Sequence, residues 1–188
     1  MRSSAASDVY KRQLLGGGRK QIVTDITISV NDPDTMVSDS LKAVARGYDC
    51  LKMKVGVNPE LDVARLSAVR NAVGKDIVIR IDANQAWTPK QAVKILNKMQ
   101  ELGLDIELVE QPVSAHDFAG LKYVTDRSYV PVLADEAVFS PENAMTILQM
   151  GAADLINIKL MKCGGIYNAL KIASAAEVFG VALSLIHI

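Results

Sequence analysis

The sequence has few cysteines, histidines and aromatic residues, and it carries no net charge. Its two cysteines, Cys50 and Cys163, form no CxxC pair and lack metal-ligand spacing, which argues against a secreted disulfide scaffold and favours a reducing cytoplasm. Lysine plus arginine and aspartate plus glutamate both number 21, so no excess of positive charge attracts nucleic acid or an anionic membrane. No apolar run reaches the roughly 18 residues that span a bilayer, and no signal peptide is recognisable. We therefore expect a soluble cytoplasmic protein.

Length and composition suit one globular domain, with 188 residues of which 49% are hydrophobic. The two ends differ from the rest. Residues 1–13, MRSSAASDVYKRQ, show no clear period, and residues 184–188 end in an apolar run without a turn or cap. Both resemble translated adapter sequence. We therefore expect residues 14–183 to form the domain, residues 1–13 and 184–188 to be non-native tails, and the chain to be a fragment.

Short β-rich runs alternate with longer helical patterns, which is typical of βα units and a parallel sheet. The expected strands are residues 23–30, 50–55, 77–82, 106–110, 132–135, 155–159 and 181–186. The expected helices are residues 34–46, 59–72, 89–102, 117–125, 141–150 and 166–179. Thr88-Pro89 and Ser140-Pro141 place a capping residue before a proline at the first helical position. This succession fits a doubly wound open sheet or a (β/α)8 barrel that lacks its last unit.

Five of the expected strands carry an ionisable residue at or near their carboxyl ends. These residues are Lys54, Asp82, Glu110, Asp135 and Lys159, separated by 28, 28, 25 and 24 positions, or one βα unit each. Each carboxylate taken singly could instead cap a turn, end a strand or pair with a helix. Together they would line the face on which α/β barrels build their sites.

The three carboxylates of this set would converge within a few ångströms if the sheet closes. A buried cluster of unpaired acids is very costly, and a divalent metal removes that cost. Carboxylate oxygens, with no histidine or cysteine placed beside them, suit Mg²⁺ better than Zn²⁺. The sequence therefore predicts a magnesium site.

Two lysines share one face of the strand LKMKVG, residues 51–56, because side chains alternate with a period of two. Taken alone, Lys52 and Lys54 are typical of a wet edge strand. In an eight-stranded barrel the second and sixth strands lie opposite each other, so Lys54 and Lys159 would flank a metal-bound substrate carboxylate. One could remove an α-proton and the other return it to the opposite face. Lys52 would favour proton loss from Lys54 and help hold the enediolate.

The motifs LKMKVG, RIDANQAW, LVEQP, VLADEA and INIKLMKCGG resemble the enolase superfamily, specifically its muconate lactonising subgroup, over most of the chain. That superfamily uses a lysine or histidine base with Mg²⁺ that stabilises an enediolate. The resemblance implies an incomplete (β/α)8 TIM barrel, with the capping domain and the last strand missing. It implies these site residues: Lys54 and Lys159 as the acid/base pair, Lys52 as their partner, Asp82, Glu110 and Asp135 as Mg²⁺ ligands, Asn84 and Glu136 in support of the ligands, and Thr24 and Lys52 as substrate contacts.

Within the subgroup, the segments VTDITISVN and NIKLMKCGG look most like dipeptide epimerases, typified by L-Ala-D/L-Glu epimerase. This likeness implies a Mg²⁺-dependent isomerase that works by two-lysine 1,1-proton transfer on a small dipeptide or other carboxylate substrate. Muconate cycloisomerase, o-succinylbenzoate synthase and N-acylamino acid racemase share the lysines and ligands and stay open as alternatives, as does an inactive metal-binding fragment. A non-catalytic binding module on a flavodoxin-like open sheet is the alternative of another class. No nucleic acid or membrane partner is expected, and a homo-oligomer of the full-length protein is left open.

Overall fold

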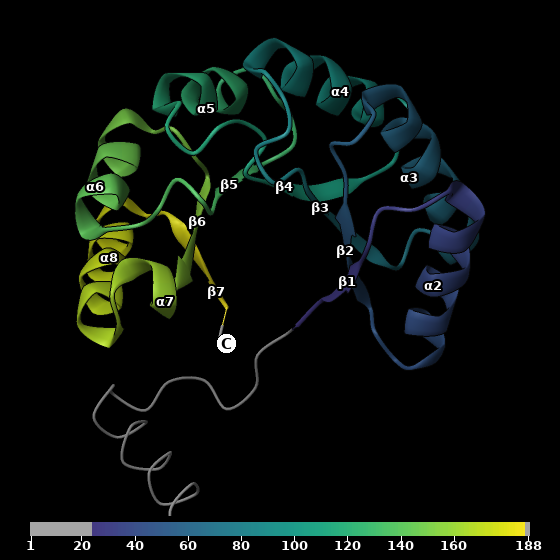
Figure 1. Cartoon of the computed structure of the whole chain (residues 1–188), viewed down its shortest axis with the longest axis horizontal. Coiled ribbons are helices and arrows are strands. Elements are labelled where there is room, and N and C mark those ends of the chain that lie inside the picture. Colours follow the sequence, from purple (N-terminus) through teal and green to yellow (C-terminus); the bar gives the residue numbers. More distant parts are fainter. Residues whose placement is uncertain (1–23, 187–188) are drawn as a thin grey trace, which may run out of the picture.

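The computed structural model describes residues 24–186, in which strands and helices alternate along the chain (Figure 1). The strands are β1 (Ile26–Ile28), β2 (Cys50–Lys54), β3 (Val78–Asp82), β4 (Ile106–Glu110), β5 (Val132–Ala134), β6 (Leu155–Lys159) and β7 (Ala182–Ile186). The helices are α2 (Pro33–Ala45), α3 (Pro59–Val73), α4 (Pro89–Glu101), α5 (Phe118–Thr125), α6 (Pro141–Met150), α7 (Leu160–Cys163) and α8 (Ile166–Phe179).

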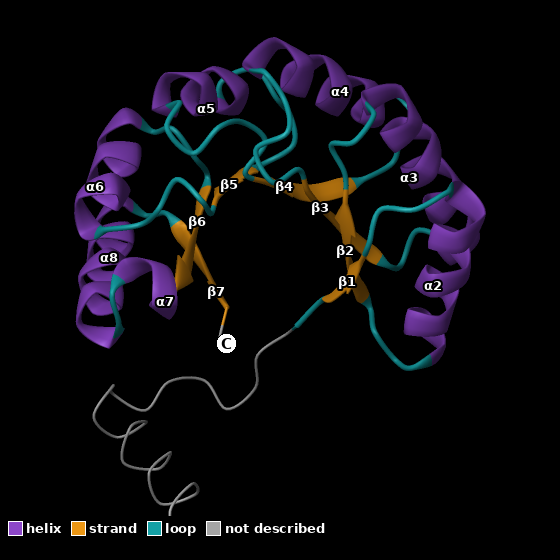
Figure 2. Ribbon diagram, in the orientation of Figure 1, coloured by secondary structure: helices purple, strands orange, loops and turns teal. Residues whose placement is uncertain are grey.

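The strands form one sheet whose order is the chain order, β1 to β7, and every neighbouring pair is parallel. They line the inner side of an open arc, and the helices cover its outer side (Figure 2). The expected α/β class and incomplete (β/α)8 barrel are thereby confirmed. Where six helices were expected, the described residues form seven, because the short helix α7 directly follows β6.

Two helices begin at the capping residues that the sequence indicates. The Thr88 side chain accepts the N–H of Gln91 at the start of α4, and the Ser140 side chain accepts the N–H of Asn143 at the start of α6. Each hydroxyl satisfies a backbone donor that has no partner within the helix, and the following proline has no N–H to satisfy. These caps fix the ends of the loops that lead from the sheet edge into the outer helices.

The core lies between the sheet and the outer helices. Leu51 and Met53 of β2 and Ile79 and Ile81 of β3 are fully buried there, in one cluster with apolar residues of α3. Burying such a side chain contributes about 1.5–3 kcal/mol relative to leaving it exposed. The alternate position Lys52 must point the other way, to the inner side of the arc. The pattern of β2 therefore sends its apolar residues to the core and its lysines to the interior of the barrel.

Some element boundaries differ from those expected. Strand β1 spans Ile26–Ile28 rather than residues 23–30, so Thr24 precedes it. Strand β5 ends at Ala134, because the N–H of Asp135 donates to the Gln111 side chain. Of the expected tails, residues 1–13 lie outside the described residues, as do 187–188, whereas residues 184–186 continue β7.

Both cysteines, Cys50 and Cys163, are free and buried. Within residues 24–186, no helix combines the length and apolar character needed to cross a membrane.

Candidate active site

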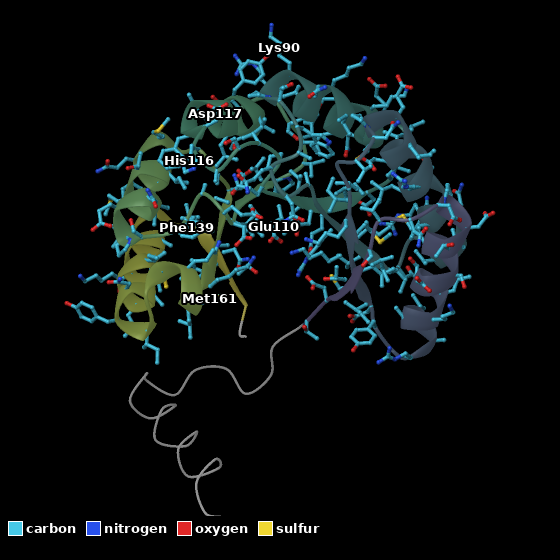
Figure 3. All side chains as sticks on the ribbon, viewed as in Figure 1. Lys90, Glu110, His116, Asp117, Phe139 and Met161 are labelled. Carbon is cyan, nitrogen blue, oxygen red and sulfur yellow. The ribbon has the colours of Figure 1, made fainter. Side chains whose placement is uncertain are left out.

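The expected ionisable residues do gather at the carboxyl ends of successive strands. Strand register sets Lys54 beside Asp82, and Asp82 beside Glu110, so these three stand at one level on β2, β3 and β4. Asp135 directly follows β5, and Lys159 is the last residue of β6. Figure 3 shows Glu110 on the inner side of the arc. A row of charged side chains therefore runs along this edge of the sheet.

Lys52 lies between two of the carboxylates. Its Nζ is 2.9 Å from Oδ2 of Asp82 and 2.5 Å from Oε2 of Glu110, and its side chain is only 10% exposed. Both carboxylates are buried as well. A buried ion pair holds together when each charge has close partners, and removing one partner leaves the other uncompensated. Lys52 is thus a fixed bridge between β3 and β4.

Lys54 is more accessible, with 33% of its side chain exposed, and its Nζ is 2.8 Å from Oδ2 of Asp82. It also donates to Oδ1 of Asn84. Asn84 in turn donates from its backbone N–H to Oδ1 of Asp82 (3.1 Å) and from Nδ2 to Oε1 of Glu136 (2.9 Å). The two residues expected to support the ligands, Asn84 and Glu136, therefore contact each other, and Asn84 links them to Lys54.

Asp135 is fully buried and is bound by two lysines. Lys159 Nζ is 2.5 Å from Oδ2, and Lys162 Nζ is 2.6 Å from Oδ1. Asn157 of β6 also donates to Oδ1 from Nδ2, at 3.0 Å. Lys162 and Asn157 were not among the expected site residues. Lys162 stands three positions after Lys159, a spacing that brings two side chains together only where the chain is helical, and no helix was expected here.

Gln111 braces the loop that carries Asp135. Its side chain is completely buried, its Oε1 accepts the N–H groups of Asp135 (2.9 Å) and Ala137 (3.0 Å), and its Nε2 donates to the carbonyl of Val113 (2.9 Å). It has φ +37°, which is uncommon for a residue other than glycine. Such backbone conformations persist where the surroundings over-determine them. Gln111 therefore fixes Asp135 relative to its chain neighbour Glu110.

The charges of the cluster shift the pKa values of its members. Burial, reinforced by the negative charge of Asp82, raises the pKa of Glu110 to about 7, although the Lys52 ammonium opposes this. Burial would lower the pKa of Lys52, but Glu110 and Asp82 outweigh it and raise that pKa to about 12. Burial would likewise raise the pKa of Asp135, and its hydrogen bonds from Lys159 and Lys162 bring it below its ordinary value. Lys52 is therefore a permanent cation at neutral pH.

One carboxylate oxygen of the site suits a divalent cation, but the three carboxylates are not arranged as the sequence predicted. Glu110 Oε1 is buried without a hydrogen-bond partner, so one ligand oxygen is free to bind a cation. However, the expected convergence of the three carboxylates is not seen. In residues 24–186, no three histidine, cysteine or acidic side chains lie close enough together to hold a metal ion. Lysine ammonium groups lie between the acids instead, because buried carboxylates need a cation nearby.

Thr24 lies apart from this cluster. It precedes β1 and lines a hollow with residues 46–49, which lead into β2, so it stands at the amino ends of the strands. The site lies at the opposite edge, and we assign Thr24 no part in it. Thr27 is the threonine of β1 that stands level with Lys52 in the strand register. The sequence could have indicated Thr27 only if the register between β1 and β2 had been known.

The chain is similar to known proteins in both sequence and fold. Residues 36–187 match the family described as Enolase C-terminal domain-like. The L-Ala-D/L-Glu epimerase of Clostridium acetobutylicum is 57% identical over 173 residues, which are 92% of this chain and 48% of that protein. A substrate-liganded complex of the Bacillus subtilis L-Ala-D/L-Glu epimerase matches with a TM-score of 0.90 at 49% identity, covering 92% of this chain and 48% of that one.

A second solved structure is the dipeptide epimerase of Enterococcus faecalis complexed with Mg and the dipeptide L-Leu-L-Tyr. It matches with a TM-score of 0.88 at 48% identity, over 92% of this chain and 48% of that one. The chain thus spans about half the length of the curated relatives that it matches. The fold, the row of charged strand ends and these matches together show that the chain belongs to the enolase C-terminal domain-like family.

Proposed function

We propose that residues 24–186 form the catalytic barrel of a Mg²⁺-dependent dipeptide epimerase that acts on dipeptides of the L-Ala-D/L-Glu type. The observation that supports this most directly is the placement of the lysines. Lys54 ends β2 and Lys159 ends β6, and these strands lie on opposite sides of the opening of the arc, with the carboxylate-bearing strands between them (Figure 1). Two bases on opposite sides of one substrate carbon are what inversion of its configuration requires.

Lys54 and Lys159 are the proton-transfer pair in this proposal. Each is partly exposed, and each donates to an oxygen of a predicted ligand, Lys54 to Asp82 and Lys159 to Asp135. A lysine must release that oxygen and lose a proton before it can act as a base. One neutral lysine then takes the α-proton, while the other, still an ammonium, delivers a proton to the opposite face.

The remaining charged residues bind the substrate carboxylate and stabilise the charge that develops on it. Lys52 stays cationic and can donate a hydrogen bond to the enediolate as the α-proton leaves. Asp82, Glu110 and Asp135 would hold Mg²⁺ once the lysines that now occupy their oxygens move aside and the three carboxylates draw together, and the metal would supply the charge that makes the α-proton acidic. Four lysines face four carboxylates here, those of Asp82, Glu110, Asp135 and Glu136, so a bound Mg²⁺ would give the site the positive charge that attracts an anionic substrate.

The test is α-proton exchange in D2O. Because the chain spans about half the length of its relatives, residues 24–186 are placed in the B. subtilis L-Ala-D/L-Glu epimerase in exchange for the segment that they match. L-Ala-D-Glu and L-Ala-L-Glu are supplied separately, and loss of the Glu α-proton is followed by NMR with Mg²⁺ and with EDTA. We expect exchange from both configurations with Mg²⁺ and none with EDTA.

Variants assign the two bases. Lys54→Ala should abolish exchange from one configuration and Lys159→Ala exchange from the other, whereas Lys171→Ala, an exposed lysine of α8, should change neither. If either site variant still interconverts both isomers at the parent rate, the two-base assignment is wrong. Exchange from only one configuration in the parent would favour a cycloisomerase or another subgroup reaction. No exchange and no Mg²⁺ effect would favour a binding module.

A further inference from the structure

The two oxygens of Asp135 have different partners. Oδ1 accepts from Lys162 (2.6 Å) and from Asn157 (3.0 Å), whereas Oδ2 accepts from Lys159 (2.5 Å). Lys162 also donates to the backbone carbonyl of Asp135, at 2.5 Å. The Lys162 ammonium thus donates to two atoms of Asp135, whereas the Lys159 ammonium donates to one.

The surroundings of the two lysines reinforce this difference. The Lys162 side chain is 11% exposed and its Nζ lies 5.5 Å from the centre of the Phe139 ring, so protein covers it on two sides. Helix α7, which carries Lys162, is tied to α8 where Asn168 Nδ2 donates to the carbonyl of Cys163 (2.7 Å). Lys159 is 22% exposed.

The energetic consequence follows from burial. To leave Asp135, Lys162 would have to break two short charge-assisted hydrogen bonds together and leave a fully buried carboxylate oxygen with Asn157 as its remaining partner. Lys159 breaks one such bond at the more open side of the carboxylate. Oδ1 is therefore held, and Oδ2 is the oxygen at which one cation can replace another.

We propose that Lys162 is a positioning residue that fixes Asp135 through Oδ1 and the backbone carbonyl, so that Oδ2 becomes an exchangeable cation position occupied by Lys159 or by the metal. These different roles of Lys162 and Lys159 rest on the proposed function only where the metal is named as the cation that can replace Lys159 at Oδ2. The held oxygen and the single-contact lysine are properties of the metal-free protein and can be measured in it.

The metal-free test observes the lysine ammonium groups of the 188-residue chain by ¹⁵N NMR, after circular dichroism has shown that the chain and its variants are folded. Ammonium protons become observable when hydrogen bonds and burial slow their exchange with water. We expect a protected signal from Lys162 that persists in Lys159→Met and disappears in Asp135→Asn. An unprotected Lys162, or one that loses its signal in Lys159→Met, overturns the proposal.

The metal test titrates Mn²⁺, in place of Mg²⁺, into the same proteins and measures binding by the loss of the free-ion EPR signal. Lys162→Met should weaken Mn²⁺ binding by about 10- to 100-fold, the usual effect of removing a residue that orients a ligand. Lys162→Arg should restore part of the affinity, because a guanidinium can donate to Oδ1 and the carbonyl at once. Lys159→Met should bind Mn²⁺ at least as tightly as the parent.

Simple charge repulsion between Lys162 and the metal predicts the opposite change in Mn²⁺ affinity, so the two explanations can be told apart. If Lys162 merely repelled the metal, its removal would tighten Mn²⁺ binding, and that result overturns the proposal, as does no change. Lys171→Met is the matched control, since that lysine also lies over an aromatic ring, 4.4 Å from the centre of Tyr167, yet is exposed. A parent chain that binds no Mn²⁺ would count against the proposed function, and the NMR result would then decide the role of Lys162 alone.

Discussion

Replacing Gln111 by leucine should destabilise the protein strongly although leucine is of similar size. The substitution removes the acceptor of two backbone N–H groups, at Asp135 and Ala137, and the donor to the Val113 carbonyl, all in a fully buried setting. A buried polar group left without its partner costs about 1–3 kcal/mol. Because the three groups are adjacent, their costs do not simply add, and we expect a total loss of about 3–6 kcal/mol.

Urea unfolding followed by far-UV circular dichroism measures this loss as a change in the free energy of unfolding. Gln149→Leu, at an exposed position of α6, is the control and should change that free energy by no more than about 0.5 kcal/mol. Amide hydrogen exchange gives a local readout, since the Asp135 N–H should exchange faster in Gln111→Leu. A loss below about 1 kcal/mol, with unchanged exchange at Asp135, would refute the bracing role of Gln111.

Three further predictions concern the scaffold. Burial raises the pKa of the Cys50 thiol to about 11, so iodoacetamide at pH 8 should label it only after unfolding, and rapid labelling of the folded protein would contradict its burial. Gly56→Ala should lower the melting temperature more than Gly47→Ala. Both glycines have positive φ, but only at Gly56 would the new Cβ lie 2.4 Å from Ala86 Cβ. Equal decreases would mean that backbone strain at positive φ acts alone, without the steric clash. Arg70→Met should lower the free energy of unfolding by several kcal/mol, because the Arg70 guanidinium donates four hydrogen bonds to backbone carbonyls. Each buried carbonyl left unpaired costs about 1–3 kcal/mol. A loss no larger than that caused by replacing an exposed arginine would argue against this role.

The row of strand ends could be read from the sequence because it depends on local rules. Strand period and the length of a βα unit place Lys54, Asp82 and Glu110 at corresponding positions of successive strands, and the register of β2, β3 and β4 aligns them as expected. Capping signals located α4 and α6 for a similar reason, since a cap and its helix are close in sequence.

The choice of ion pairs could not be read from the sequence, because it depends on which groups meet in three dimensions. Nothing in the sequence indicated that Lys52 would bridge Asp82 and Glu110, as it does in the structure. Lys162 lies on α7, a helix of four residues with no side-chain cap, so no local signal announced the element that positions it. Thr24 was assigned to the site by the family resemblance, whereas in the structure it precedes β1 and lies at the amino ends of the strands.

A sheet ordered as the chain is ordered makes the described part of the protein a nearly one-dimensional array, in which each βα unit contacts chiefly the units before and after it. In such arrays, opening starts at the ends and spreads inward one unit at a time. Asp82, Glu110 and Asp135 belong to the central strands β3 and β4 and the end of β5, with two strands on each side of these three. The carboxylate-bearing strands should therefore be the last to lose protection, and amide exchange should slow from β1 and β7 toward β4.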